Sequence, residues 1–463
     1  MPVSLLRAAR RGPALVAVLA TMLILGGSPL AVHAEESPAP GTTPPPGPLV
    51  PPPPAPPAPA PAGPSFVSGP IPVGETITLY GRGYGHGVGL SQWGARGRAL
   101  AGQDAPTILA HYYPSTTLQA VDPATPVRVL LVSNFAPRPD RPARVVGLNG
   151  PWTIDGVEAP FPAGASLVVV PGPTGWQATV LAPDGTSPWS APVSGALVIR
   201  PVGPESRLQV GFKAGPANVY RGTIRLLLGS RVSAVNELGL DDYLLGVVPS
   251  EMPDRWPVEA LKAQAITART YALRHLRPAT IAWDVYDDTR SQVYRGVLVE
   301  RPTVSQAVLA TSGQVLMAGS SVANTPFHSA DGGATENNEF VWTRADGTAV
   351  NRPVAELRGS PDRAPDGTPY DAASPSSSWQ TASYSIDAFS AIMAASPRTA
   401  VGRVTAIAFD RRGVSGRAVA VTLYGSDGVK TVSGTIFRIV FNANRPKGDP
   451  GLRSTLIDLA PIP

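Results

Sequence analysis

The sequence Leu240-Asp-Asp-Tyr-Leu-Leu-Gly-Val-Val-Pro-Ser-Glu251-Met-Pro253 marks a change in the hydrophobic pattern of this chain. Before it lie short alternating runs that are typical of strands. After it, between Pro257 and Pro278, apolar residues fall at i, i+4, i+7 and i+11. This spacing predicts a helix that has Pro257 at its first position and follows shortly after Glu251. Its small apolar residues would pack closely against a sheet: Leu261, Ala265, Ala268 and Ala272.

The region between Val127 and Leu228 consists of short alternating runs separated by Gly- and Pro-rich turns, which is typical of β structure. Beyond Val315 we again expect only short strands and turns. Together with the helix, these patterns predict a mixed α+β fold: a strand-rich core with a few helices around a cleft, plus an inserted β-rich region. The runs read as strands are 76–80, 127–132, 166–170, 196–200, 223–228, 404–409 and 418–423.

Composition limits the kinds of site that this chain can contain. Its 463 residues exceed the roughly 100–200 of one domain, so two packed domains and tails are expected. Charged residues make up 15%, while Pro (54) and Gly (47) are abundant, which disfavours long helices. The absence of cysteine excludes disulfides, cysteine nucleophiles and thiolate metal sites.

The N-terminus predicts export. Three arginines precede an apolar run from Ala14 to Leu25, and Val32-His-Ala34 fits a signal peptidase site, so residues 1–34 are interpreted as a signal peptide. The alternative is a retained anchor, although about 12 apolar residues are short for a span of about 20. Removal of the segment lowers the formal net charge from +5 to +2, so the basic pI does not indicate a nucleic-acid partner.

The remaining chain divides into four predicted parts. Residues 35–70 are dominated by Pro and Ala and are interpreted as a disordered polyproline linker. Residues 71–122 carry a Gly/His motif that we expect to pack on the core. Residues 123–230 are the β-rich region, and residues 231–463 the core that carries the chemistry. The expected location is secreted or in the cell envelope, with membrane contact only if the signal segment is retained.

The segment Gly81-Arg-Gly-Tyr-Gly-His-Gly-Val-Gly-Leu-Ser-Gln-Trp-Gly94 has glycine at alternate positions. The spacing matches neither a phosphate-binding loop nor a dinucleotide fingerprint, and its Gly89–Gly94 end is one residue too long for a serine-hydrolase elbow. Missing side chains let a ligand or another backbone approach, with His86, Gln92 and Trp93 supplying polar and stacking groups. The alternative is a glycine-rich turn that only packs on a neighbouring sheet.

Glu251 is the candidate proton donor. A carboxylic acid at the end of an apolar stretch can have the raised pKa that a general acid needs. The alternative is an acid that enters the following helix and interacts with its dipole. A third polar segment, Phe327-His-Ser-Ala-Asp-Gly-Gly-Ala-Thr-Glu-Asn337, would either line a cleft or form an ordinary surface loop.

Taken together, these segments resemble the stage II sporulation protein D (SpoIID/LytB) family. The resemblance runs from about Ile71 to the C-terminus and is weakest over 123–216. The matching stretches are Leu240–Pro253, Glu259–Tyr271, Asp287–Tyr294, His328–Asn337 and Gly85–Gly89.

The resemblance implies a peptidoglycan lytic transglycosylase. Glu251 would protonate the oxygen between N-acetylmuramic acid and N-acetylglucosamine and then accept a proton from the sugar's C6 hydroxyl, leaving a 1,6-anhydro end. It also implies a preference for strands without peptide. By the same analogy the substrate would contact His86, Gln92, Trp93, Gln264, Arg269, Tyr271, Gln292, Tyr294, His328, Ser329 and Thr335.

Two departures from the family pattern are visible. The glycine–histidine motif precedes the core here, whereas it follows the core in sporulation members; a circular permutation would place it beside Glu251. Some sporulation members bind zinc through cysteines, but the corresponding positions here are Tyr286, Ser291 and Asp331, so no metal or cofactor is expected. The competing function is a non-catalytic wall-binding protein that stimulates a cell-wall amidase.

Overall fold

The computed structural model describes residues 69–216 and 218–462. The predicted signal peptide (1–34) and residues 35–68 of the predicted linker lie outside the described residues. The described part is α+β, with several open sheets and helices grouped beside them, so the predicted fold class is confirmed. None of the described helices is long and apolar enough to cross a membrane.

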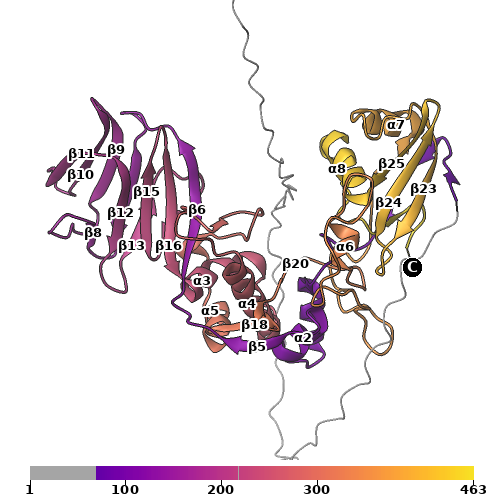
Figure 1. The fold of residues 1–463 in the computed structure, drawn as a ribbon, viewed down its shortest axis with the longest axis horizontal. Helices are drawn as coiled ribbons and strands as arrows, with labels where there is room; N and C mark the ends of the chain where they lie inside the picture. The colour runs from indigo at the N-terminus through magenta and orange to yellow at the C-terminus, as the bar shows by residue number, and fades with distance from the viewer. Residues whose placement is uncertain (1–68, 217, 463) are drawn as a thin grey trace, which may run out of the picture. The chain divides into compact units, whose positions relative to one another are not determined.

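Two six-stranded sheets form the β-rich part (Figure 1). One has the order β11-β10-β9-β7-β13-β14 and the other β17-β6-β16-β15-β12-β8. All pairs are antiparallel except β17–β6. The strands of the first are β7 Ala143–Leu148, β9 Ser166–Gly172, β10 Gly175–Leu181, β11 Trp189–Val193, β13 Arg207–Val210 and β14 Val219–Tyr220. Those of the second are β6 Pro126–Phe135, β8 Trp152–Ile154, β12 Gly195–Pro201, β15 Thr223–Leu228, β16 Val232–Gly239 and β17 Val285–Tyr286.

The inner faces of these sheets share one hydrophobic core. Along β15, Ile224, Leu226 and Leu228 are buried and alternate with half-buried residues, as a strand with one covered face requires. Trp152 of the second sheet is fully buried against Gly147 of the first, where an added Cβ would lie 1.9 Å from the indole ring. Gly147 therefore allows the two layers to meet.

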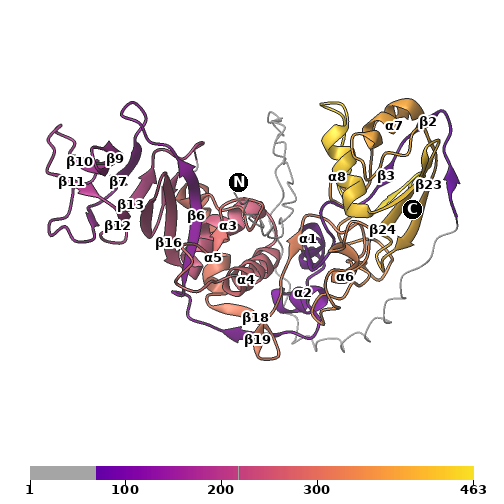
Figure 2. The same cartoon turned by 45° about the horizontal axis from the view of Figure 1, so that its top comes forward.

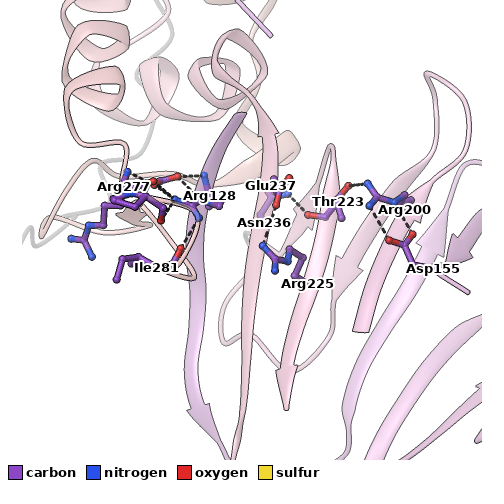
Figure 3. Close-up of polar contacts among 11 residues, drawn as sticks. Arg128, Asp155, Arg200, Thr223, Arg225, Asn236, Glu237, Arg277 and Ile281 are labelled. Carbon is purple, nitrogen blue, oxygen red and sulfur yellow. Dashed lines mark hydrogen bonds and ion pairs between the residues drawn. The ribbon is translucent and has the colours of Figure 1, made fainter. Parts of the chain in front are cut away.

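The opposite face of the second sheet carries paired charges (Figure 3). Arg128 of β6 lies opposite Glu237 of β16 and forms an ion pair with Asp284 at 2.6 Å. Glu237 in turn lies 3.4 Å from Arg225 of β15. Farther along the face, Arg200 contacts Thr223 and pairs with Asp155. Opposite charges on neighbouring strands favour this register, and the polar row shows which face meets solvent.

Helices pack where β16 ends and β6 begins (Figure 2). α3 (Leu240–Glu251) follows β16 directly, and α4 (Val258–Arg274) packs against α3 and α5 (Pro302–Ala310). The predicted helix is confirmed as α4, although Pro257 precedes it as the N-cap and it ends at Arg274. The short elements here are η1 Gly296–Val299 and the sheet β19-β18-β5, formed by β5 Thr117–Ala120, β18 Gln314–Ala318 and β19 Ser321–Val322.

The Gly/His segment leads into two further helices. Strand β4 (Leu90–Ser91) pairs in parallel with β20 (Phe327–His328) and runs into α1 (Gln92–Leu100), for which Ser91 is the N-cap and accepts from Gly94 N–H. α2 (Ala105–Tyr112) follows, and both helices pack on α4. The short helix α6 is Asn338–Val341.

The C-terminal part has its own hydrophobic core. A sheet of order β1-β23-β24-β25 is packed by α7 and α8 (Figure 2). β3 (Tyr80–Gly81) pairs with β26 (Ile457–Asp458), so a segment near the start of the described residues lies beside the last strand, as a circular permutation requires. The remaining bounds are β1 Ile71–Pro72, β2 Thr76–Ile77, β21 Trp379–Gln380, β22 Tyr384–Ser385, α7 Ile386–Ala394, β23 Val404–Arg412, β24 Ala418–Gly425, β25 Gly428–Ser433 and α8 Gly434–Asn444.

The expectation of only strands and turns beyond Val315 is wrong, because α7 and α8 lie in this region. Each begins at a serine whose hydroxyl accepts a backbone N–H of the first turn: Ser385 from Ala388 and Ser433 from Ile436. These are ordinary N-caps, and Phe437, Val440 and Phe441 follow at helical spacing on the buried face of α8.

Candidate active site

Glu251 is the last residue of a helix and does not simply precede one, which corrects the expected local structure. α3 was missed because Pro249 lies inside it and breaks the sequence pattern. Pro249 has no backbone N–H, so α3 lacks one hydrogen bond, but the helix continues for only two more residues. At this end the helix dipole is negative and opposes ionisation of Glu251. The alternative concerned the following helix, but Glu251 lies outside α4, which begins at Val258 after the N-cap Pro257.

The Glu251 carboxyl group is half-buried and held by a backbone donor. Val293 N–H donates to Oε1 at 3.0 Å, and Gln92 Nε2 donates to the backbone carbonyl of Glu251 at 3.3 Å. Burial raises the pKa of Glu251, while the Val293 N–H, the Gln92 side chain and the charge of Arg295 favour the ionised form. Burial dominates, so Glu251 holds its proton to a higher pH than an exposed glutamate.

The segment that supplies Val293 packs directly on α3. An added Cβ at Gly246 would lie 2.6 Å from the Tyr294 ring, so only glycine lets Tyr294 lie flat against the helix. The Tyr294 hydroxyl donates to Asn236 Oδ1 at 2.8 Å. Gln292 is buried, accepts from the Tyr243 hydroxyl and donates to the Ala268 carbonyl. In this structure Gln292 and Tyr294 therefore fix the backbone that holds Glu251.

The alternating glycines bring a second backbone into contact with the Gly/His segment. Their φ angles are positive, a conformation that favours glycine: Gly83 (73°), Gly85 (107°), Gly87 (85°) and Gly89 (70°). An added Cβ at Gly85 would lie 2.8 Å from His328 Cβ, and one at Gly89 would lie 2.1 Å from the Pro326 carbonyl oxygen. The close approach predicted from the glycines is therefore made by another part of the same chain.

Two histidines meet at this contact. The rings of His86 and His328 lie 5.2 Å apart. His86 Nδ1 accepts from Val88 N–H at 3.0 Å, and burial together with nearby Arg417 lowers the pKa of His86 to about 4. His328 Nδ1 lies 3.3 Å from the Val88 carbonyl, so Nδ1 is the donor. His328 Nε2 is then a buried acceptor without a partner among the described residues.

Aromatic side chains adjoin the Glu251 end of α3. Trp93, next to Gln92, lies edge-on to Trp256 with ring centroids 4.9 Å apart. The Arg96 guanidinium lies 5.3 Å from the Trp93 ring centroid and 6.0 Å from that of Trp256. The backbone N–H of Trp93 donates to the Ser329 carbonyl, which ties α1 to the segment after β20. Tryptophan faces and edges of this kind suit contact with sugar rings.

The other predicted site residues on α4 occupy different environments. Arg269 is fully buried, with Nε 2.6 Å from Asp241 Oδ1 and the other guanidinium nitrogens on backbone carbonyls of Gln314 and Val308. Gln264 is also fully buried, but both amide atoms lack a partner among the described residues. Arg269 thus supports the fold, and Gln264 has free hydrogen-bonding capacity.

Two further predicted residues, Tyr271 and Thr335, contact their own neighbours. Tyr271 is half-buried, stacks on His275 with centroids 4.0 Å apart and is hydrogen-bonded by Ser291. Thr335 is buried, and its hydroxyl and backbone exchange hydrogen bonds with Ser360. In the described part of the chain, no group of three or more His, Asp or Glu side chains is placed to hold a metal ion.

Sequence reasoning missed three contributors: Trp256, Arg96 and the Val293 N–H. A helix starting after the Ser91 N-cap would have been a usable signal, because it places Gln92 and Arg96 on one face. Nothing in the local sequence indicates that Trp256 reaches Trp93 or that a backbone N–H meets Glu251. These contacts join segments more than 40 residues apart.

A sequence comparison supports what the motifs suggested. The model of the family described as "Stage II sporulation protein" matches residues 229–317. The chain carries a stage II sporulation protein D family domain. This match covers α3, α4 and the Asp287–Arg295 segment, and therefore includes Glu251 and Val293. It includes neither the Gly/His segment nor His328.

Individual relatives agree with this assignment. The chain is 32% identical over 160 residues to "Stage II sporulation protein D" of Bacillus subtilis and 40% identical over 100 residues to "Amidase enhancer" of the same organism. It is 37% identical over 136 residues to an uncharacterized protein of Brachyspira hyodysenteriae. The alignments cover 31%, 22% and 29% of this chain, and 44%, 13% and 37% of the relatives, respectively. No solved structure matches the chain at a significant level.

Proposed function

We propose that this SpoIID-family protein is a peptidoglycan lytic transglycosylase of the cell envelope, with Glu251 as its acid and base. The observation that carries the proposal is a partly buried glutamate whose pKa is raised by burial and whose Oε1 is held by a backbone N–H. A general acid needs a raised pKa and a fixed direction, and the burial of Glu251 together with its hydrogen bond from Val293 supports both for this residue.

The proposed reaction differs from ordinary glycoside hydrolysis in the number of acids that it needs. Glycosidases use two carboxyl groups, about 5–5.5 Å or 6.5–9.5 Å apart. Among the described residues, the charged side chain that acts on Glu251 is a cation, Arg295. A lytic transglycosylase needs one acid, because the substrate's own C6 hydroxyl is the nucleophile.

The chain's groups would divide the work as follows. Protonated Glu251 donates to the oxygen that links N-acetylmuramic acid to N-acetylglucosamine. The bond between C1 of N-acetylmuramic acid and this oxygen breaks, and N-acetylglucosamine leaves with a free hydroxyl. The Glu251 carboxylate accepts the proton of the C6 hydroxyl as the C6 oxygen bonds to C1, which gives a 1,6-anhydro end. Val293 N–H holds Oε1 and stabilises the carboxylate between the two steps. Trp93 and Trp256 offer ring surface to a neighbouring sugar.

A second candidate is a non-catalytic wall protein that stimulates an amidase. It is favoured by the similarity to the amidase enhancer and by the structural use of several motif residues. Gln292, Tyr294 and Arg269 are buried and engaged within the protein, so the motif alone does not require catalysis.

The two functions are separated by product analysis. Purified protein is incubated with glycan strands, with and without stem peptides, and products are identified by mass spectrometry. The proposal expects 1,6-anhydro-muramyl ends from the wild type and a loss of about 100-fold or more for Glu251→Gln. Glu158→Gln, at an exposed position, is the matched control and should retain full activity.

Equal activity in Glu251→Gln, or no anhydro product from folded wild type, would overturn the transglycosylase proposal. The second candidate would be established by two results together. Wild type and Glu251→Gln would both sediment with purified cell wall without forming anhydro product, and adding the protein would speed amidase turnover.

A further inference from the structure

An open cavity lies in the β-rich part of the chain, between the turn before β7 and the turn after β13. Its volume is about 460 Å³, within the range of roughly 300–1,000 Å³ that small-molecule sites occupy. Three cationic side chains and one acidic side chain line it, together with a phenylalanine and a glycine. These residues are Asp140, Arg141, Arg144, Gly211, Phe212 and Lys213.

The pairing of β7 with β13 brings two of the cations together. Val145 of β7 lies opposite Val210 of β13, and the backbone N–H of Gly211 donates to the Arg144 carbonyl at 2.8 Å. A Cβ built at Gly211 would lie 3.7 Å from Arg144 Cβ and 3.9 Å from Arg144 Cδ, so the Arg144 stem passes beside this glycine. Arg144 and Lys213 therefore line the cavity from neighbouring backbones.

Contacts within the β-rich part hold both arginines. The Arg141 guanidinium lies 5.2 Å from the centroid of the Phe135 ring, and that ring lies 4.9 Å from the ring of Phe212. Arg144 Nη1 donates to the Ser166 hydroxyl at 3.4 Å. Side chains that are already ordered lose less conformational entropy when a ligand binds, so the cavity is prepared for a charged ligand.

The charges that line the cavity do not balance one another. Lys213 forms an ion pair with Asp287 of the core segment. Neither Arg141 nor Arg144 forms an ion pair in the described part of the chain, and Asp140 forms none within the same residues. The cavity thus offers two guanidinium groups to carboxylates and one carboxylate to an amino group.

We infer that this cavity binds an acidic peptide that has two carboxylates and one amino group. Each guanidinium can hold one carboxylate through two parallel N–H···O bonds, and the Asp140 carboxylate can accept from the amino group. A polymer whose only charges are phosphates would be opposed by Asp140. Peptidoglycan stem peptides have the required groups, so the cavity would attach the protein to peptide-bearing strands.

The inference goes beyond the function proposed for Glu251. The cavity shares no lining residue with the Glu251 site, so the strand that is attached and the strand that is cleaved can be different ones. Attachment through the cavity also suits the second candidate, a wall protein that stimulates an amidase, because it does not require cleavage.

The test measures binding of a soluble probe, N-acetyl-L-alanyl-γ-D-glutamyl-L-lysine, to the purified protein by calorimetry. The probe has two carboxylates and one amino group. Wild type should bind it about 10-fold or more tightly than the same peptide with both carboxylates amidated. Arg141→Gln and Arg144→Gln should each raise the Kd of the probe by about 10-fold and leave that of the amidated peptide unchanged.

Two further variants separate the cavity from the general charge of the surface. Arg138→Gln removes an exposed arginine of the same turn that does not line the cavity. It should leave the Kd within about twofold of wild type, because solvent and salt screen an exposed charge. Gly211→Leu changes no charge, and its Cβ would meet its nearest atom at 3.5 Å, so this variant should fold and obstruct the cavity. Thermal unfolding of each variant is measured alongside binding.

Three results would overturn the inference: no binding of the probe by wild type, equal weakening by Arg138→Gln and Arg141→Gln, or unchanged binding by folded Gly211→Leu. Tighter binding of glycerol 3-phosphate than of the probe would assign the cavity to a phosphate ligand and overturn it as well. Unchanged binding of the probe by Glu251→Gln supports a separate site, whether or not wild type cleaves glycan. Failure of the transglycosylase proposal and failure of this inference are therefore distinguishable.

Discussion

Val293 N–H donates a hydrogen bond to Glu251 Oε1 at 3.0 Å, across 42 positions of sequence. It joins the C-terminal end of α3 to the segment that returns from β17 toward η1. The bond fixes one carboxyl oxygen and leaves the other to act as proton donor or acceptor. It also limits how far burial can raise the pKa of Glu251, because a backbone N–H stabilises the carboxylate.

The first prediction concerns pH and activity. Protonated Glu251 is the proposed acid and its pKa is raised, so kcat should fall as pH rises through that pKa. We expect this alkaline limb to lie above 4.5, the ordinary value for glutamate. The measurement is the rate of anhydro-end formation from pH 4 to 9. A limb at the ordinary value of glutamate would contradict the raised pKa.

The second prediction concerns pH and stability. Because the pKa is higher in the folded chain, folding binds a proton between the two values. Stability from Glu251 is therefore full below the unfolded value and decreases as pH rises through the folded one. As pH rises, the free energy of unfolding of wild type should therefore fall relative to that of Glu251→Gln, which has no carboxyl group to ionise at this position. Denaturant unfolding at several pH values checks this, and a pH-independent difference would refute it.

The third prediction concerns the contact between α3 and Tyr294. Gly246→Ala would place a Cβ 2.6 Å from the Tyr294 ring and force that segment away from Glu251. We expect a loss of about 1–3 kcal/mol in the free energy of unfolding, with a larger fall in activity than in substrate binding. Gly229→Ala is the control, because its nearest atom would lie 3.8 Å away. Equal effects of both substitutions would show that Tyr294 does not position Val293.

The fourth prediction separates fold from substrate contact at Arg269. Its guanidinium is buried on Asp241 and two backbone carbonyls, so Arg269→Met should leave Asp241 uncompensated and cost about 3–5 kcal/mol. Thermal unfolding and KM are measured together. We expect a lower Tm and, at temperatures where the variant stays folded, an unchanged KM. A raised KM at unchanged Tm would restore Arg269 to the substrate site.

Local sequence was a good guide wherever one short segment contains its own signal. The small-residue stripe of α4, the alternation in β15 and the apolar run of β24 need no distant partner to be recognised. The sequence did not predict α3 because a proline, Pro249, lies inside it. It did not predict α7 and α8 because their serine N-caps stand among residues that are typical of turns. The Ser385 and Ser433 caps can be recognised in the sequence. Nothing in the local sequence shows that α3 tolerates Pro249.

The chain's order of residues determined which groups are available: one glutamate after an apolar run, alternating glycines, no thiols and a helix of small residues. Tertiary structure alone decided what each group faces. Hydrogen bonds, ring contacts and burial depend on side chains that arrive from distant segments, and no local pattern records them. That is why Gln292 and Arg269 turned inward, while Arg96 and Trp256 joined Glu251.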